Sequence, residues 1–118
     1  DLHSFPTRRS SDLYSLAFVC TAPGADAVEM VGDARYVVNA DLASCEFGLM
    51  IADDWHHTGI AGLLMETLIH AARGRGLKTM EGLVLATNNT MLRFSRGLGF
   101  ELSAVPEDLT TMRIVKKL

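Results

Sequence analysis

One change of pattern constrains the fold of this chain more than any other feature. A strand-like alternation over residues 45–52 (CEFGLMIA) gives way, after a short polar loop, to a helical period over residues 59–73 (GIAGLLMETLIHAAR). Large apolar side chains occupy alternate positions in the first segment and recur at i, i+3, i+4 and i+8 in the second. A buried strand that leads into an amphipathic helix predicts a domain of the mixed α/β class.

The remaining segments extend this pattern in both directions. A second, shorter helix is expected over residues 88–97, and a turn around Pro23 and Gly24 within residues 21–27. Apolar runs rich in β-forming residues predict further strands at 14–20, 28–39 (bulged near Gly32), 77–86, 100–105 and 111–115. The order β-β-β-α-β-α-β-β predicts a mixed, mostly antiparallel sheet flanked by helices, and its first three strands are expected to form a meander.

The composition argues against several classes of protein. Apolar residues make up 48% of the 118 residues, too many for a disordered chain, yet no run approaches the ~18 residues of a membrane span. The net charge of −3 argues against general nucleic-acid binding.

Cys20 and Cys45 are too few for a disulfide framework or a zinc set, so we expect buried free thiols and a reducing cytoplasm. The adjacent His56 and His57 have no third ligand at zinc-binding spacing, so no metal is expected.

The first thirteen residues differ from the rest of the chain. They read DLHSFPTRRSSDL, they show neither period, and residues 3–13 resemble the translation of a sequencing adapter. We therefore expect residues 1–13 to be a non-native segment and residues 14–118 to be a partial domain. The alternative is a genuine basic arm with Arg8 and Arg9 as its charges.

The loop between the strand and the helix carries the clearest functional signal. Residues 51–64 read IADDWHHTGIAGLL, with Gly59, Ala61 and Gly62 at the start of the helix. Small side chains let a ligand approach the backbone, and the free N–H groups and dipole of a helix N-terminus favour an anion such as a pyrophosphate. Simple helix-to-sheet packing explains the same small residues and stays open as the alternative.

This stretch resembles motif A of the GNAT superfamily of acetyl-CoA-dependent N-acetyltransferases, Q/R-x-x-G-x-G/A. Residues 56–61, HHTGIA, occupy its place. Asn88 matches an asparagine that opens the next helix in many members, and residues 98–100 match the L-G-F that ends it. The segments CEFGLMIADDW and MEGLVLATNN are most similar to bacterial domains of the protein-acetyltransferase type, often found beside or fused to acyl-CoA synthetases.

The resemblance implies how the coenzyme is bound. The pantetheine arm of acetyl-CoA would pair with the third strand near Leu49, Met50 and Ile51, and Asn88 would contact the coenzyme. An amine, possibly a protein lysine, would attack the thioester directly, and a backbone N–H of the same strand would stabilise the oxyanion. The pyrophosphate would lie on the backbone of His57, Thr58, Gly59, Ile60, Ala61 and Gly62.

Glu46 is the candidate general base, because it lies in a strongly apolar strand and matches a glutamate of the protein-acetyltransferase type. The alternatives are an exposed edge residue or an ion-pair partner of Arg35. Glu81 is the reserve base, although a structural ion pair also explains it. Ser95 stands where many members have a tyrosine acting as general acid, and a serine is a poor acid.

Two departures from the family pattern qualify the function. His56 replaces the usual glutamine or arginine, and Thr58 replaces a frequent arginine and is a candidate helix N-cap. The family's N-terminal strand and two helices, which wall the acceptor site, are expected to be missing, which would favour a homodimer. The sequence thus predicts an acyl-CoA-dependent N-acyltransferase. A non-catalytic, acyl-CoA-binding regulatory module is the alternative.

Overall fold

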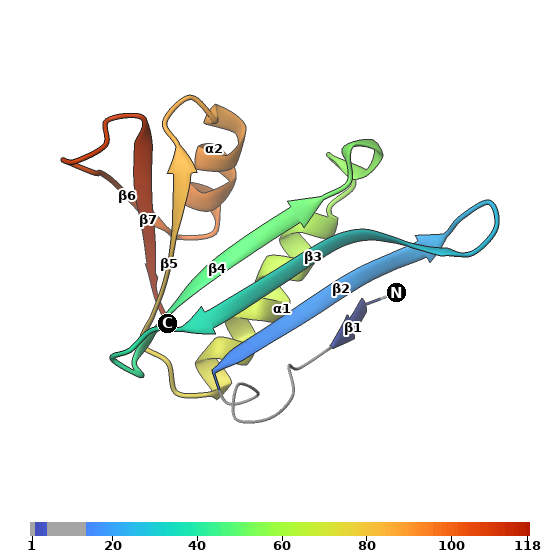
Figure 1. Cartoon of the computed structure of the whole chain (residues 1–118), viewed down its shortest axis with the longest axis horizontal. Coiled ribbons are helices and arrows are strands. Elements are labelled where there is room, and N and C mark those ends of the chain that lie inside the picture. Colours follow the sequence, from blue (N-terminus) through green and yellow to red (C-terminus); the bar gives the residue numbers. More distant parts are fainter. Residues whose placement is uncertain (1, 5–13) are drawn as a thin grey trace.

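The computed structural model describes residues 2–4 and 14–118, the first three through their backbone alone. Within these residues one seven-stranded sheet has the order β1-β2-β3-β4-β5-β7-β6, and both α-helices lie against one side of it (Figure 1). The elements are β1 (Leu2–Ser4), β2 (Ser15–Pro23), β3 (Val28–Val38), β4 (Ser44–Ile51), the 3₁₀ helix η2 (Asp53–Trp55), α1 (Ile60–Gly74), β5 (Thr79–Leu85), α2 (Asn89–Gly97), β6 (Glu101–Ala104) and β7 (Thr111–Lys117).

Strands β2, β3 and β4 form the predicted antiparallel meander. Strand β2 runs through Pro23, so the expected turn at residues 21–27 is shorter than predicted. A proline is tolerated there because it ends the strand and needs no ladder hydrogen bond. The register between β2 and β3 shifts at Cys20 and Thr21, which pair with Gly32 and Met30, and this confirms a bulge next to Gly32.

The sheet opens between its two central strands. Strands β4 and β5 pair in parallel over only three positions, from Ser44 with Thr79 to Glu46 with Glu81. Both then continue, β4 to Ile51 and β5 paired with β7, but they no longer bond to one another (Figure 1). The diverging strands leave one edge of β4 free in the centre of the molecule.

The core lies between the sheet and α1. Leu64, Met65 and Leu68 of α1 are fully buried, and so are Tyr36 and Cys45 on the facing strands. Each large apolar side chain buried in this way stabilises the fold by about 1.5–3 kcal/mol. The predicted alternation in β4 is confirmed: Cys45 is buried, Phe47, Leu49 and Ile51 pack against the core, and Glu46, Gly48 and Met50 face the other side.

The fold class and the order of elements from residue 14 onward are confirmed. Residues 1–13 are excluded from the fold prediction because they show no period, yet Leu2–Ser4 forms a strand that pairs antiparallel with residues 18–20 of β2. The outer edge of β2 offers free N–H and C=O groups, and such an edge accepts a partner strand whatever its side chains. Asp1 and residues 5–13 lie outside the described residues, so the proposed origin of this segment is untested. Neither described α-helix is long and apolar enough to cross a membrane.

Candidate functional site

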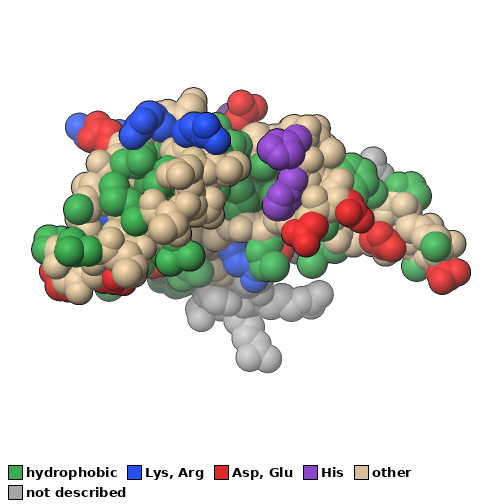
Figure 2. All heavy atoms as spheres, turned by 90° about the horizontal axis from the view of Figure 1, so that it is seen from above, with side chains coloured by type: hydrophobic (Ala, Val, Ile, Leu, Met, Phe, Trp, Pro, Cys, Tyr) green, Lys and Arg blue, Asp and Glu red, His purple; other side chains and the backbone are tan. Residues whose placement is uncertain are grey.

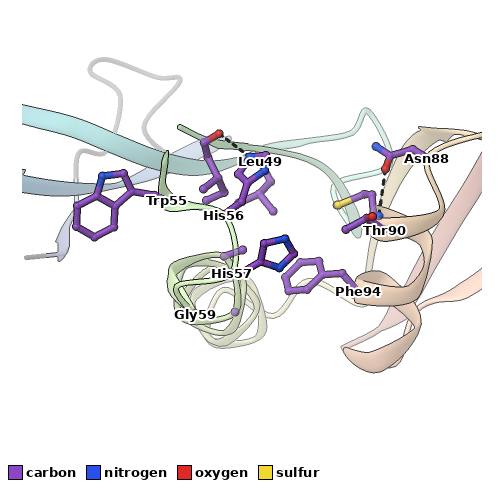
Figure 3. A pocket seen from close by; sticks show the side chains of 12 residues that line it. Leu49, Trp55, His56, His57, Gly59, Asn88, Thr90 and Phe94 are labelled. Atoms are coloured by element: carbon purple, nitrogen blue, oxygen red, sulfur yellow. Dashed lines mark hydrogen bonds between the residues drawn. The ribbon is translucent and has the colours of Figure 1, made fainter. Parts of the chain in front are cut away.

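A cavity of about 800 Å³ opens on the helical side of the sheet, where β4 ends and α1 begins (Figure 3). Three walls enclose it: the end of β4, the loop leading into α1, and the start of α2. The lining residues are Leu49, Ile51, Trp55, His56, His57, Gly59, Ala61, Gly62, Asn88, Thr90, Met91 and Phe94. Figure 2 shows the molecule from above the view of Figure 1, with histidine side chains beside an apolar hollow and Lys or Arg side chains across it.

The β4 wall combines apolar side chains with free backbone. Leu49 and Ile51 line the cavity, whereas the Met50 side chain points to the opposite face and is 71% exposed. Alternation along the strand dictates this difference. Beyond Glu46, the edge of β4 that faces β5 has no strand partner among the described residues. Its backbone N–H and C=O groups are therefore available to an extended ligand.

The loop into α1 is held by hydrogen bonds to its own backbone. His56 Nε2 lies 3.2 Å from the carbonyl oxygen of Ile51, and the Thr58 hydroxyl donates to the carbonyl of Trp55 at 2.5 Å. His57 adopts a left-handed conformation, with φ at 64°. The prediction that Thr58 caps the helix is wrong, because its hydroxyl is used within the loop and the N-cap is Gly59, with φ at 91°.

The start of α1 leaves backbone donors free. No side chain caps this helix and no acidic residue lies in its first turn, while the first helical bond runs from the N–H of Leu63 to the carbonyl of Gly59. A Cβ added at Gly59 or at Gly62 would meet no heavy atom within 4 Å. Packing therefore does not require a glycine at Gly62. The space in front of it is open, and an open helix N-terminus suits an anion.

The third wall comes from α2. The Asn88 side chain caps this helix by accepting a hydrogen bond from the N–H of Met91 at 3.1 Å, and Phe94 is directed toward the cavity and toward His57 (Figure 3). Ser95 is only 1% exposed and does not line the cavity. The hydroxyl at the position of the family's general acid is therefore out of reach of a ligand.

The cavity brings together most of the residues that the sequence assigned to the coenzyme, from β4, the α1 loop and Asn88. The side chains of Met50, Thr58 and Ile60 do not line it. Sequence reasoning missed Thr90, Met91 and Phe94 as lining residues. Helical spacing from Asn88 was a signal for Met91 alone, at i+3, because Thr90 at i+2 and Phe94 at i+6 do not share the face of Asn88.

Glu46 lies on the opposite, helix-free face. A hollow of about 200 Å³ there is lined by Glu46, Glu81, Gly82, Leu83 and Arg113. The alternative that Glu46 pairs with Arg35 is wrong, because the Arg35 guanidinium pairs with Asp33 at 3.1 Å. Glu81, the reserve base, pairs with Arg113 at 2.5 Å. Among the described residues no ion-pair partner contacts Glu46, so its carboxylate lines this hollow unpaired.

The other reactive side chains play no part in the cavity. Cys20 and Cys45 are free and buried, and burial raises the pKa of the Cys45 thiol to about 12, with a further contribution from Glu81. The described residues contain no group of three His, Cys, Asp or Glu side chains that could hold a metal ion. The rings of His56 and His57 lie edge to face, with their centres 6.5 Å apart.

Comparisons with known proteins agree with this architecture. Residues 8–100 match the model of the acetyltransferase (GNAT) family. Acetyltransferase PA5475 of Pseudomonas aeruginosa is 33% identical over 96 residues, which cover 81% of this chain and 52% of that protein. The chain thus spans about half the length of this curated relative.

Solved structures show the same fold. The GNAT domain of S. lividans PAT superposes with a TM-score of 0.80 at 22% identity, covering 96% of this chain and 65% of that one. The ribosomal-protein-S18-alanine N-acetyltransferase of Escherichia coli gives a TM-score of 0.74 at 16% identity, covering 99% and 94%. The family match covers most of the chain, including the strand, loop and helix around the cavity. The chain therefore belongs to the GNAT acetyltransferase family.

Proposed function

We propose that this domain transfers an acyl group from acyl-CoA to a primary amine. The observation that carries the proposal is the opening of the sheet between β4 and β5, which has a coenzyme-sized cavity on one face and Glu46 on the other. A donor bound on the helical side and an acceptor bound on the opposite side would meet at this opening. Membership of the GNAT family supports the same reaction class.

The donor fits the residues of the cavity. Free N–H groups at the start of α1 suit the pyrophosphate, and the open space in front of Gly59 and Gly62 admits it. The free edge of β4 suits the amide groups of the pantetheine arm, which would add to the sheet as a short strand. Phe94 and Leu49 supply apolar contacts along the way.

The chemistry follows from the position of Glu46. Its carboxylate takes a proton from the acceptor ammonium, and the neutral amine nitrogen then attacks the thioester carbonyl carbon. A C–N bond forms and the C–S bond breaks, so the coenzyme leaves as a thiolate that solvent protonates. A backbone N–H on the free edge of β4 stabilises the oxyanion during the attack. No side-chain acid on α2 is needed, because a thiolate is already a good leaving group.

The finer features of the proposal come from the likeness to bacterial protein acetyltransferases. We propose acetyl-CoA as the donor, a protein lysine as one class of acceptor, and an acyl-CoA synthetase as a fusion or working partner. The two buried free thiols are consistent with a reducing cytoplasm. A homodimer is a further expectation, which measurement of the mass in solution tests directly.

Substitution of the base tests the mechanism. We expect Glu46→Gln to lower kcat by about a hundred-fold or more, the usual contribution of a general base, with little change in the KM for acetyl-CoA. The measurement is thiol release from acetyl-CoA with a panel of amines. Glu101→Gln is the matched control, because Glu101 is exposed on the same sheet face and does not line the hollow. An unchanged kcat in Glu46→Gln would remove Glu46 from the mechanism.

A non-catalytic acyl-CoA-binding module is the second candidate. The observation that favours it is the burial of Ser95, which leaves the family's general-acid position on α2 out of reach of the cavity. Tight binding of acetyl-CoA, measured by calorimetry, together with no thiol release for any amine would establish the binding module. Amine-dependent thiol release would exclude it.

A further inference from the structure

The hollow on the helix-free face is lined by both acidic and basic side chains, and the proposed reaction uses only one of them, Glu46. Glu46 and Glu81 are register partners on the neighbouring strands β4 and β5, so their side chains leave the sheet about 5 Å apart. Among the described residues, Arg113 from β7 is the one cation that lines the hollow. In the proposed mechanism Glu46 is the general base, whereas Arg113 has no function.

The two glutamates differ in their state of pairing. The Arg113 guanidinium bonds to Glu81 through Nη2, and Asn39 donates to the other carboxylate oxygen of Glu81 at 3.4 Å. Glu81 is thereby neutralised, whereas Glu46 has no ion-pair partner among the described residues. The hollow therefore presents one unpaired carboxylate and, one strand away, a cation.

Arg113 retains donors for a second acceptor group. Its side chain is 50% exposed, and among the described residues Glu81 is its one ion-pair partner. A guanidinium has five N–H donors in a planar fork, so bonding to Glu81 through one terminal nitrogen leaves others directed at the solvent. A carboxylate is the group that such a fork binds best. The Glu81 contact holds the guanidinium in place, which lowers the entropy cost of binding.

We propose that Arg113 determines acceptor specificity: the hollow takes an amine that also carries a carboxylate, with the ammonium at Glu46 and the carboxylate at Arg113. This inference rests on the proposed function, because it uses Glu46 as the site of the acceptor amine. Charge complementarity favours it over a polyamine, whose second ammonium would face the guanidinium. The exposed side chain of Leu83, which also lines the hollow, suits the methylene groups between the two charges.

Acceptor binding tests the proposal without requiring turnover. ω-Amino acids from glycine to 5-aminopentanoate and the n-alkylamines of equal length are titrated by calorimetry into the full chain saturated with coenzyme A. We expect the best amino acid to bind about ten- to a hundred-fold more tightly than its alkylamine, the range for a charge-assisted hydrogen bond. The preferred chain length reports the separation between Glu46 and Arg113. Equal affinities for both series would overturn the proposal.

Variants assign the preference to Arg113. Arg113→Gln should abolish the preference for amino acids without weakening alkylamine binding, because it frees the Glu81 carboxylate in the same hollow. Arg113→Lys should retain part of the preference. Arg96→Gln, which changes an exposed arginine of α2 outside the hollow, is the control. Equal weakening of both ligand series by Arg113→Gln would show a merely structural ion pair and contradict the inference.

Thiol release separates this inference from the proposed function. If acetyl-CoA releases thiol with alkylamines and amino acids alike, the transferase function stands and the role of Arg113 is wrong. If amino acids bind preferentially but no amine promotes thiol release, the binding preference stands and the transferase function is wrong.

Discussion

At the scale of single residues, two buried hydroxyls identify positions that packing has not matched with polar partners. Among the described residues, no hydrogen-bond partner contacts the hydroxyl of Tyr36 or that of Ser95. Tyr36 is 1% exposed, and burial raises the pKa of its phenol. An unpaired buried hydroxyl carries a desolvation cost of about 1–3 kcal/mol.

Tyr36→Phe is therefore expected to stabilise the domain. The substitution removes the unpaired hydroxyl and keeps the ring, so the free energy of unfolding should rise by about 1 kcal/mol. Urea denaturation measures this change. Tyr14→Phe is the control, because Tyr14 is 42% exposed and its hydroxyl gains nothing from removal. A loss of stability in Tyr36→Phe would show that the hydroxyl has a partner in solution.

Asp41 links stability to pH in the turn between β3 and β4. Hydrogen bonds from the N–H groups of Ala43 and Ser44 and from the Ser44 hydroxyl hold the pKa of its carboxyl below the ordinary value. A lowered folded-state pKa means that the stabilisation is present above the unfolded-state pKa and is lost as pH falls through the folded-state pKa. Wild-type protein should therefore lose stability below about pH 4.

Asp41→Asn should reduce that loss, because the amide has no carboxyl to protonate. Urea midpoints measured between pH 7 and about pH 2.5 provide the test, over the range where aspartates titrate. Asp26→Asn, an exposed position in the turn between β2 and β3, is the matched control. Parallel pH profiles for wild type and Asp41→Asn would contradict the assignment.

At the scale of elements, the two glycines of α1 allow the stability of the helix and the binding of a ligand to be tested separately. Gly62 and Gly74 lie at opposite ends of this helix, and a Cβ at either would meet no heavy atom within 4 Å. Alanine is favoured over glycine by up to about 1 kcal/mol in a helix. Both glycines are thus suboptimal for the helix, and only Gly62 lines the cavity.

Gly62→Ala should raise stability and weaken binding of acetyl-CoA, because the new methyl group enters the space in front of the free N–H groups. We expect an increase in the free energy of unfolding of at most about 1 kcal/mol and a rise in Kd of ten-fold or more. Gly74→Ala should give a comparable or smaller stabilisation with an unchanged Kd. Denaturation and calorimetry on both variants test this pair, and an unchanged Kd in Gly62→Ala would remove the anion site from the start of α1.

The elements show where sequence reasoning succeeds. The period of α1 and the cap at Asn88 fixed both helix starts to within one residue, because those signals are local. The end of β2 and the strand Leu2–Ser4 were missed, because both depend on what the neighbouring strand edge offers. Phe94 and Ser95 are neighbours on α2, but their side chains face different surroundings. Adjacent residues lie about 100° apart on a helix, and in the structure only Ser95 is fully buried.

At the scale of the whole molecule, the candidate site depends on the separation of β4 from β5, which no local sequence pattern predicts. Alternation predicted that Glu46 and Leu49 face opposite sides of β4, but not that β5 separates from β4 after Glu81. That separation connects the cavity on one face with the hollow on the other. Past Glu81, β5 keeps its pairing with β7 up to Leu85, a contact between segments distant in the sequence.

The thiol of Cys45 offers a measure of the whole fold. It is fully buried, and its pKa is raised to about 12 by burial and by Glu81, so it should react with iodoacetamide only when the domain opens. The proposed binding of acetyl-CoA to the folded state should slow the labelling about a hundred-fold at a hundred times the Kd of the wild-type domain. Mass spectrometry of the alkylated protein measures the rate, with urea-unfolded protein as the reference for full reactivity. At the same acetyl-CoA concentration, Gly62→Ala should be protected only about ten-fold or less, whereas Gly74→Ala should keep the full protection. Rapid labelling of the native protein, or equal protection in both variants, would show that the cavity and the core of the domain are not coupled as the fold requires.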